Sequence, residues 1–185
     1  MSGHSKWSQI KRGKAVTDGA RSRVFSRFAK HIALESKKAN GNAAAPSLAA
    51  VIARAKAANM PKDNIERAVA KGMSKDAGSL EQVVYEAYGP AGVALIVEAM
   101  TDNKNRTTQE IKHLLSQHGV ELAAPGSALW AFSKKPEGGF AANEPLVDVD
   151  ERDAESLEKL LDAIDEHEDV QVFFTNARGY ESAGD

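Results

Sequence analysis

The chain has 185 residues, of which 42% are hydrophobic and 27% charged, and its net charge is −2. This composition is typical of a folded globular protein with room for two small cores. Cysteine is absent, which excludes disulfides, thiolate metal sites and cysteine nucleophiles. The longest mainly apolar stretch, residues 92–100, is too short to span a bilayer, and the N-terminus lacks a signal-peptide pattern, so we expect a cytoplasmic protein.

The charge is distributed unevenly along the chain. Residues 1–38 hold ten Lys and Arg against two acids, whereas residues 136–185 hold fifteen acids and three cations. A positive field concentrated at one end indicates a polyanionic partner such as nucleic acid. The acidic end repels phosphate and is left for solvent or for a basic protein.

Three amphipathic helices are predicted in the N-terminal part. Residues 1–17 show no clear period and are interpreted as an extended basic arm. A first helix begins at Asp18, and further helices begin near Pro46 and Pro61, the last ending at Gly72. In the first helix one arc is cationic and another is apolar, the apolar residues being Val24, Phe25, Phe28, Ala29 and Ile32. Because such short helices are not stable singly, we expect a basic three-helix domain over residues 1–78.

The apolar period changes towards two beyond residue 79. The segments predicted there are strands at 82–88 and 93–101, a helix at 105–118, strands at 127–133 and 146–149, a helix at 153–168 and a strand at 170–175. Without the first hairpin strand, the order is β-α-β-β-α-β. This order predicts an α+β domain over residues 79–185 with a ferredoxin-like (split βαβ) antiparallel sheet and both helices on one face.

Five short stretches resemble the YebC/PmpR family, which includes the mitochondrial translational activator of cytochrome oxidase. They are Gly3-His4-Ser5-Lys6-Trp7, Asn59-Met60-Pro61, Tyr85-Glu86-Ala87-Tyr88-Gly89-Pro90, Asp102-Asn103-Lys104-Asn105-Arg106-Thr107 and Gly126-Ser127. Members are described as probable transcriptional regulators that bind promoter DNA and as ribosome-associated factors that help translation of proline-rich stretches. The resemblance therefore implies a nucleic-acid partner, DNA or ribosomal RNA, and makes the ribosome a further candidate partner.

The chain departs from the family pattern in its second half. Family members usually carry an additional small domain between the strand ending near Lys135 and the strand near Leu146. Here only residues 136–145 join the two. The resemblance thus implies a two-domain version that lacks the inserted domain.

The candidate nucleic-acid contacts are the cations of the arm and the first helix, together with a His and a Trp that could stack on a base. They are His4, Lys6, Trp7, Lys11, Arg12, Lys14, Arg21, Arg23, Arg27, Lys30 and Arg106. A solvated tail and an ordinary solvated helix face are the alternatives for the first ten. For Arg106 the alternative is a structural hydrogen bond within the turn 102–107.

Neither a metal site nor a catalytic set is predicted. The turn 102–107 has Lys104 where a calcium loop requires a ligand oxygen. The five histidines are scattered, and no Ser/His/acid or paired-carboxylate spacing is present. We therefore expect a binding protein without a cofactor rather than an enzyme.

The sequence analysis favours a nucleic-acid-binding regulator of gene expression, acting in transcription or translation. No helix carries base-reading side chains at major-groove spacing, so structured RNA is a better physical match than sequence-specific DNA. The alternative is a protein-only adaptor that acts through the acidic C-terminal domain.

Overall fold

The computed structural model describes residues 18–74, 80–136 and 138–181. These form two compact units: a helical unit of residues 18–74 and 80–82 with 100–104, and a sheet unit of residues 83–99 with 105–181. The domain boundary expected between residues 78 and 79 lies outside the described residues, so it stays a prediction. In the described parts of the chain, no helix is both long enough and apolar enough to cross a membrane.

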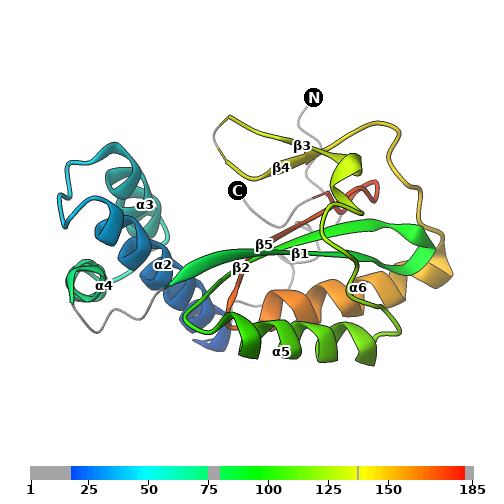
Figure 1. Cartoon of the computed structure of the whole chain (residues 1–185), viewed down its shortest axis with the longest axis horizontal. Coiled ribbons are helices and arrows are strands. Elements are labelled where there is room, and N and C mark those ends of the chain that lie inside the picture. The colour runs from blue at the N-terminus through cyan, green and yellow to red at the C-terminus, as the bar shows by residue number, and fades with distance from the viewer. Residues whose placement is uncertain (1–17, 75–79, 137, 182–185) are drawn as a thin grey trace. The chain divides into compact units, whose positions relative to one another are not determined.

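The helical unit contains the three helices expected from the sequence (Figure 1). They are α2 (Asp18–Lys38), α3 (Pro46–Ala57) and α4 (Lys62–Met73). Pro46 occupies the first turn of α3, where its missing N–H costs nothing. Their apolar faces meet in one core around Ile32, Leu48 and Ile65. Val24 was expected in this core but is 38% exposed.

The sheet unit alternates strands and helices. Its elements are β1 (Glu81–Tyr88), β2 (Ala94–Thr101), α5 (Lys104–Gln117), β3 (Phe132–Lys134), β4 (Phe140–Ala142), α6 (Glu151–Glu166) and β5 (Val170–Thr175). The Asp150 carboxylate caps α6 by accepting the backbone N–H groups of Arg152 (3.0 Å) and Asp153 (2.9 Å). This cap sets the start of α6 two residues before the predicted one.

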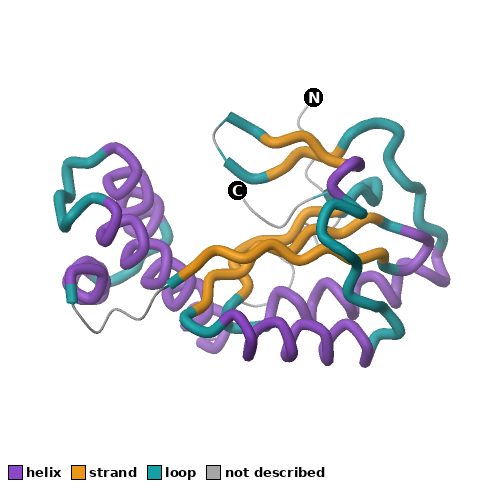
Figure 2. Tube along the Cα trace, in the orientation of Figure 1, coloured by secondary structure: helices purple, strands orange, loops and turns teal. Residues whose placement is uncertain are grey.

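The main sheet has the strand order β1-β2-β5. Strands β2 and β5 pair antiparallel, with Ile96 opposite Phe174. Helices α5 and α6 lie together on one face of this sheet, as Figures 1 and 2 show. Side chains from both helices, such as Ile111 and Leu160, join alternate residues of β2 in a single core. The antiparallel sheet with both helices on one face is confirmed.

The β3–β4 hairpin covers the opposite face of the sheet. Phe132 and Phe140 pack with Ala94, Ile96 and Phe174 in a second core. The rings of Phe140 and Phe174 meet edge to face with 5.4 Å between their centroids. Because β2 contributes to both cores in alternation, its side chains are buried on both faces of the sheet.

Two of the predicted strands are corrected by the structure. In place of a strand at 127–133 the chain forms a 3-10 helix, Leu129–Ala131, followed by the short β3. Here Glu86 takes up the backbone N–H groups of Ala128 and Leu129, so these cannot pair in a sheet.

The segment 146–149 forms no strand and makes one isolated parallel bridge, from Val147 to Ala177, which lies just beyond the end of β5. Its alternating valines pack against the larger core, which accounts for the strand-like pattern without a strand. Residues 136–145, expected to be a plain connection, include β4. The mixed α+β class is therefore confirmed, while the two middle strands of the expected ferredoxin-like order lie outside the main sheet.

Candidate nucleic-acid interface

A groove of about 620 Å³ runs between α2 and α4 in the helical unit. Four cations line it, two from each helix: Arg21 and Lys30 from α2, and Arg67 and Lys71 from α4. Of the described lining residues, Asp18 is the one acid. Its floor is apolar, formed by Phe25, Ala29, Ala33, Met60 and Ala68. A concave surface of this kind offers positive charge at its edges and apolar area between them.

The two helices approach each other closely at one glycine. A Cβ atom at Gly72 would lie 2.3 Å from the backbone oxygen of Ala33 and 2.8 Å from the Cβ of Ser36. Ser36 also donates its hydroxyl to the backbone oxygen of Val69, at 2.8 Å. The absence of a side chain at Gly72 thus sets the spacing of α2 and α4, and with it the width of the groove.

Arg67 is held in position by its neighbours on α4. Its Nε donates to the backbone oxygen of Asp63 at 3.2 Å, and its Nη2 donates to the side-chain oxygen of Asn64. Two hydrogen bonds to one guanidinium fix its orientation, while the residue remains exposed to solvent. Arg67 is therefore a preorganised cation at the edge of the groove.

A titratable pair lies further along α2. Burial lowers the pKa of His31, and the nearby charges of Arg54 and Lys38 lower it further against the opposing effect of Glu35. Burial alone would raise the pKa of Glu35, but hydrogen bonds from Lys38 and Ser47 lower it on balance. His31 is therefore neutral and Glu35 charged near pH 7.

Four of the predicted contact residues lie on α2, and the structure places two of them in the groove lining and two outside it. Arg21 and Lys30 line the groove. Arg23 and Arg27 are not among the residues that line it; both are half-buried, and the Nε of Arg27 is shielded from solvent. The arm residues His4, Lys6, Trp7, Lys11, Arg12 and Lys14 lie outside the described residues, so their role stays a prediction.

Sequence reasoning missed Arg67 and Lys71 as site residues. Both occur on a helix that was predicted correctly, and their spacing of four places them on one face. That spacing was the available signal. What the sequence did not show is that this face of α4 borders the same groove as Arg21 and Lys30, which are 37 or more positions away.

Arg106 belongs to the sheet unit and takes part in an ion-pair network. Its Nη2 lies 3.0 Å from the Oδ2 of Asp169, whose side chain is 1% exposed. Thr107 donates its hydroxyl to the same oxygen at 2.7 Å. The Arg106 side chain is itself 42% exposed. This network supports the structural alternative for Arg106, and its role as a nucleic-acid contact stays a prediction.

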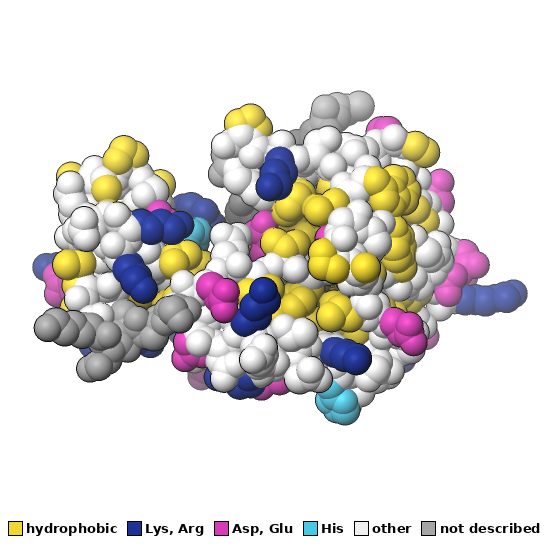
Figure 3. Space-filling view, viewed as in Figure 1, with side chains coloured by type: hydrophobic (Ala, Val, Ile, Leu, Met, Phe, Trp, Pro, Cys, Tyr) yellow, Lys and Arg dark blue, Asp and Glu magenta, His cyan; other side chains and the backbone are white. Residues whose placement is uncertain are grey.

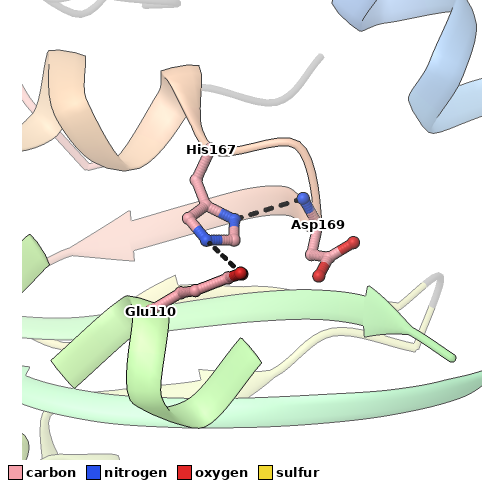
Figure 4. A group of neighbouring side chains, drawn as sticks. All are labelled: Glu110, His167 and Asp169. Carbon is pink, nitrogen blue, oxygen red and sulfur yellow. Dashed lines mark hydrogen bonds and ion pairs between the residues drawn. The ribbon is translucent and has the colours of Figure 1, made fainter. Parts of the chain in front are cut away.

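Glu110, His167 and Asp169 form the one group of three potential metal ligands found among the described residues (Figure 4). The Nε2 of His167 lies 3.3 Å from Glu110, and its Nδ1 accepts the backbone N–H of Asp169 at 3.2 Å. Because Nδ1 accepts, the ring N–H is on Nε2 and is directed at Glu110. A histidine that binds a metal through one nitrogen usually donates the N–H of its other nitrogen to a carboxylate or carbonyl oxygen, whereas Nδ1 of His167 is an acceptor. The carboxylate of Asp169 is in addition already paired with Arg106. The donor arrangement fits an ion-pair network better than a metal centre.

A buried carboxylate on β1 shapes the loop between α5 and β3. Glu86, 4% exposed, accepts the backbone N–H groups of Gly126 (2.6 Å), Ala128 (2.7 Å) and Leu129 (3.1 Å). The hydroxyl of Tyr88 donates to the backbone oxygen of Ser127 and accepts from the indole Nε1 of Trp130 at 2.8 Å. Two stretches that are 40 positions apart, and that carry family motifs, are thus joined.

Two family models cover most of the chain. The TACO1/YebC protein N-terminal domain matches residues 5–75, and the TACO1/YebC second and third domain matches residues 80–145. A "Probable transcriptional regulatory protein" of Thermosipho africanus is 43% identical over 93% of this chain and 69% of its own length. The chain belongs to the TACO1/YebC family.

Other TACO1/YebC relatives agree with this assignment. A "Probable transcriptional regulatory protein" of Thermosipho melanesiensis is 50% identical over 73% of this chain and 54% of its own length. One of the same name from Syntrophus aciditrophicus is 42% identical over 100% of this chain and 74% of its own length. The chain thus spans about half to three quarters of the length of these relatives, and whether it lacks their inserted domain stays a prediction.

A solved structure shares the fold. The crystal structure of a conserved hypothetical protein from Aquifex aeolicus superposes with a TM-score of 0.82 at 30% sequence identity. The match covers 94% of this chain and 97% of that one. The α+β architecture with three N-terminal helices is therefore the fold of an experimentally determined protein.

Proposed function

We propose that this TACO1/YebC protein is a nucleic-acid-binding regulator of gene expression that holds phosphate groups along the α2–α4 groove. The convergence of four cations from two helices on one groove is the observation that carries the proposal. The basic arm, with Lys6, Lys11, Arg12 and Lys14, would add further phosphate contacts. The proposed role is binding, not catalysis, and it agrees with the regulatory name given to the relatives.

The charge at the groove supports an anionic ligand. Among the described residues that line the groove, four are cations and one is a carboxylate, Asp18, which pairs only loosely with Arg21 at 3.9 Å. Exposed pairs of this kind contribute little and are easily exchanged for a phosphate contact. Phosphate binding at such a surface releases counterions from the nucleic acid, which makes the affinity depend steeply on salt.

The test compares two pairs of substitutions in the full-length chain. Arg67→Gln with Lys71→Gln removes two groove cations. Lys62→Gln with Lys159→Gln removes two cations that pair instead with Glu66 (3.4 Å) and Glu155 (2.7 Å) on their own helices. Fluorescence anisotropy measures binding to labelled RNA hairpins, single-stranded RNA and duplex DNA.

The groove variant should bind about tenfold more weakly for each lost contact, because a hydrogen bond to a charged group contributes about 1.5 kcal/mol or more. The control variant should bind like the unaltered chain. Equal affinities for both variants would reject the groove as the binding surface. The comparison of RNA with DNA ligands also identifies the preferred nucleic acid, which we expect to be RNA.

An adaptor function is the second candidate, and one observation favours it. Trp130 is 68% exposed yet fixed by its hydrogen bond to Tyr88, and exposed, rigid aromatic residues are frequent at protein interfaces. In this case protein partners would remain bound after nuclease treatment of a cell extract and would be lost on Trp130→Ala. Retention of the same partners by Trp130→Ala would reject the adaptor function.

A further inference from the structure

The α2–α4 groove differs from an ordinary basic surface in having an apolar floor. Phe25 and Ala29 are half-buried in it, and Met60, Ala33 and Ala68 are buried beneath it. The volume of about 620 Å³ lies within the range of sites that enclose a small ligand. Hydrophobic and basic side chains both reach the visible surface of the helical unit in Figure 3. Phosphate contact alone would require only the cations.

The apolar floor distinguishes between two kinds of nucleic acid. In a duplex the bases are stacked on one another, so that a protein surface reaches mainly phosphates, sugars and base edges. An unpaired nucleotide exposes the faces of its base, and proteins bind such faces on aromatic and apolar side chains while cations contact the neighbouring phosphates. The groove combines these two requirements in one place.

We propose that the α2–α4 groove receives an unpaired nucleotide of RNA, with the base against Phe25 and Ala29 and the flanking phosphates on the cations at the edges. Arg67 and Lys71, four positions apart on α4, hold the phosphate on that side, and Arg21 and Lys30, at different points along α2, each offer a contact to the phosphates on the other side. The inference rests on the proposed function and specifies the class of nucleic acid that the groove selects.

Polar groups in the lining are placed to contact the edge of such a base. Ser22 and Ser26 are exposed on α2, and Asn64 faces them from α4. The side-chain oxygen of Asn64 accepts from Arg67, which leaves its NH₂ group directed elsewhere. Since Arg67 is already oriented, little conformational entropy is lost when a phosphate binds to it.

The first experiment needs no protein variant. The full-length chain is titrated with a single-stranded RNA, with the same strand made duplex, and with the same strand carrying one abasic nucleotide. The single strand should bind about tenfold more tightly than the duplex. The abasic nucleotide is placed at each position of the strand in turn, and the affinity should fall about tenfold when the missing base is the one that stacks in the groove. Equal affinity for the single strand and the duplex, or no effect of an abasic nucleotide at any position, would overturn the proposal.

The second experiment compares two phenylalanines of α2. Phe25 lines the groove, whereas Phe28 packs on the same core without lining it. Phe25→Leu keeps the apolar volume but removes the aromatic face, so it should weaken single-strand binding about fivefold and leave duplex binding unchanged. Phe28→Leu should alter neither affinity.

The outcomes separate this inference from the proposed function. If Phe25→Leu binds every ligand normally while Arg67→Gln with Lys71→Gln binds more weakly, the groove contacts phosphate without holding a base, and the inference fails alone. If neither variant changes any affinity, the proposed function fails together with it. Selective loss of single-strand binding in Phe25→Leu supports both.

Discussion

Substituting Gly72 tests whether the spacing of α2 and α4 creates the groove. In Gly72→Ala the new methyl group would lie 2.3 Å from the backbone oxygen of Ala33 and 2.8 Å from the Cβ of Ser36. Neither atom can rotate out of the way, because both are fixed by the helix backbone. The helices must move apart, and the hydrogen bond from Ser36 to Val69 is expected to lengthen.

Two opposing effects determine how much the Gly72→Ala substitution changes the free energy of unfolding. Alanine is favoured over glycine inside a helix by about 1 kcal/mol, which would stabilise the variant. Overpacking of a close contact costs about 1–3 kcal/mol, and the strained hydrogen bond adds about 1 kcal/mol. Steric repulsion should therefore prevail, with a net loss of about 1–3 kcal/mol in the free energy of unfolding and weaker RNA binding.

Urea unfolding followed by far-UV circular dichroism measures the stability change. The two units need separate transitions in the fit, because a chain of two units need not unfold in one step. Ala70→Gly is the matched control, since Ala70 is exposed on the same helix and reports helix propensity alone. A Gly72→Ala chain that is as stable as the unaltered one and binds RNA equally well would refute the reasoning.

Three further predictions concern single side chains. Glu86→Gln should lower the free energy of unfolding by about 2–3 kcal/mol in urea titrations, because the amide cannot accept all three backbone hydrogen bonds. Arg106→Gln should lower the free energy of unfolding by about 1–2 kcal/mol in the same assay, because it leaves the buried Asp169 with fewer partners. The loss is modest because Arg106 is itself partly exposed. Unchanged stability would contradict the structural role of Arg106. Folding lowers the pKa of His31 from 6.5, so below that pH the unfolded chain binds more protons than the folded one. The contribution of His31 to the free energy of unfolding should therefore be constant above pH 6.5 and should become destabilising as the pH falls below it. His31→Asn should remove this decline when melting temperatures are compared between pH 7.5 and 5.5, whereas an identical decline in the variant would contradict the assignment.

The elements that were predicted correctly share strong local patterns. The apolar arc of α2 follows the helical period over several turns, and the expected buried residue Ile32 is fully buried. The strand expected at 170–175 is β5 with the same bounds. Such patterns are recorded in the sequence, because each residue's environment is set by neighbours a few positions away.

The corrected elements depend on contacts between distant residues. The strand expected at 127–133 is shortened because Glu86, more than 40 positions earlier, binds its backbone N–H groups. The groove was missed for the same reason, since it exists only once Gly72 has brought α4 against α2. Local periodicity gives the cationic face of each helix, but not which two faces border one groove.

The salt dependence of RNA binding tests the central claim most directly. For single-stranded RNA, the logarithm of the affinity falls with the logarithm of salt concentration by about 0.7 for each phosphate contact. The slope should therefore become shallower by about 1.4 in Arg67→Gln with Lys71→Gln and stay the same in Lys62→Gln with Lys159→Gln. An identical slope in all three proteins would contradict the account, because the groove cations would then make no contact with phosphate.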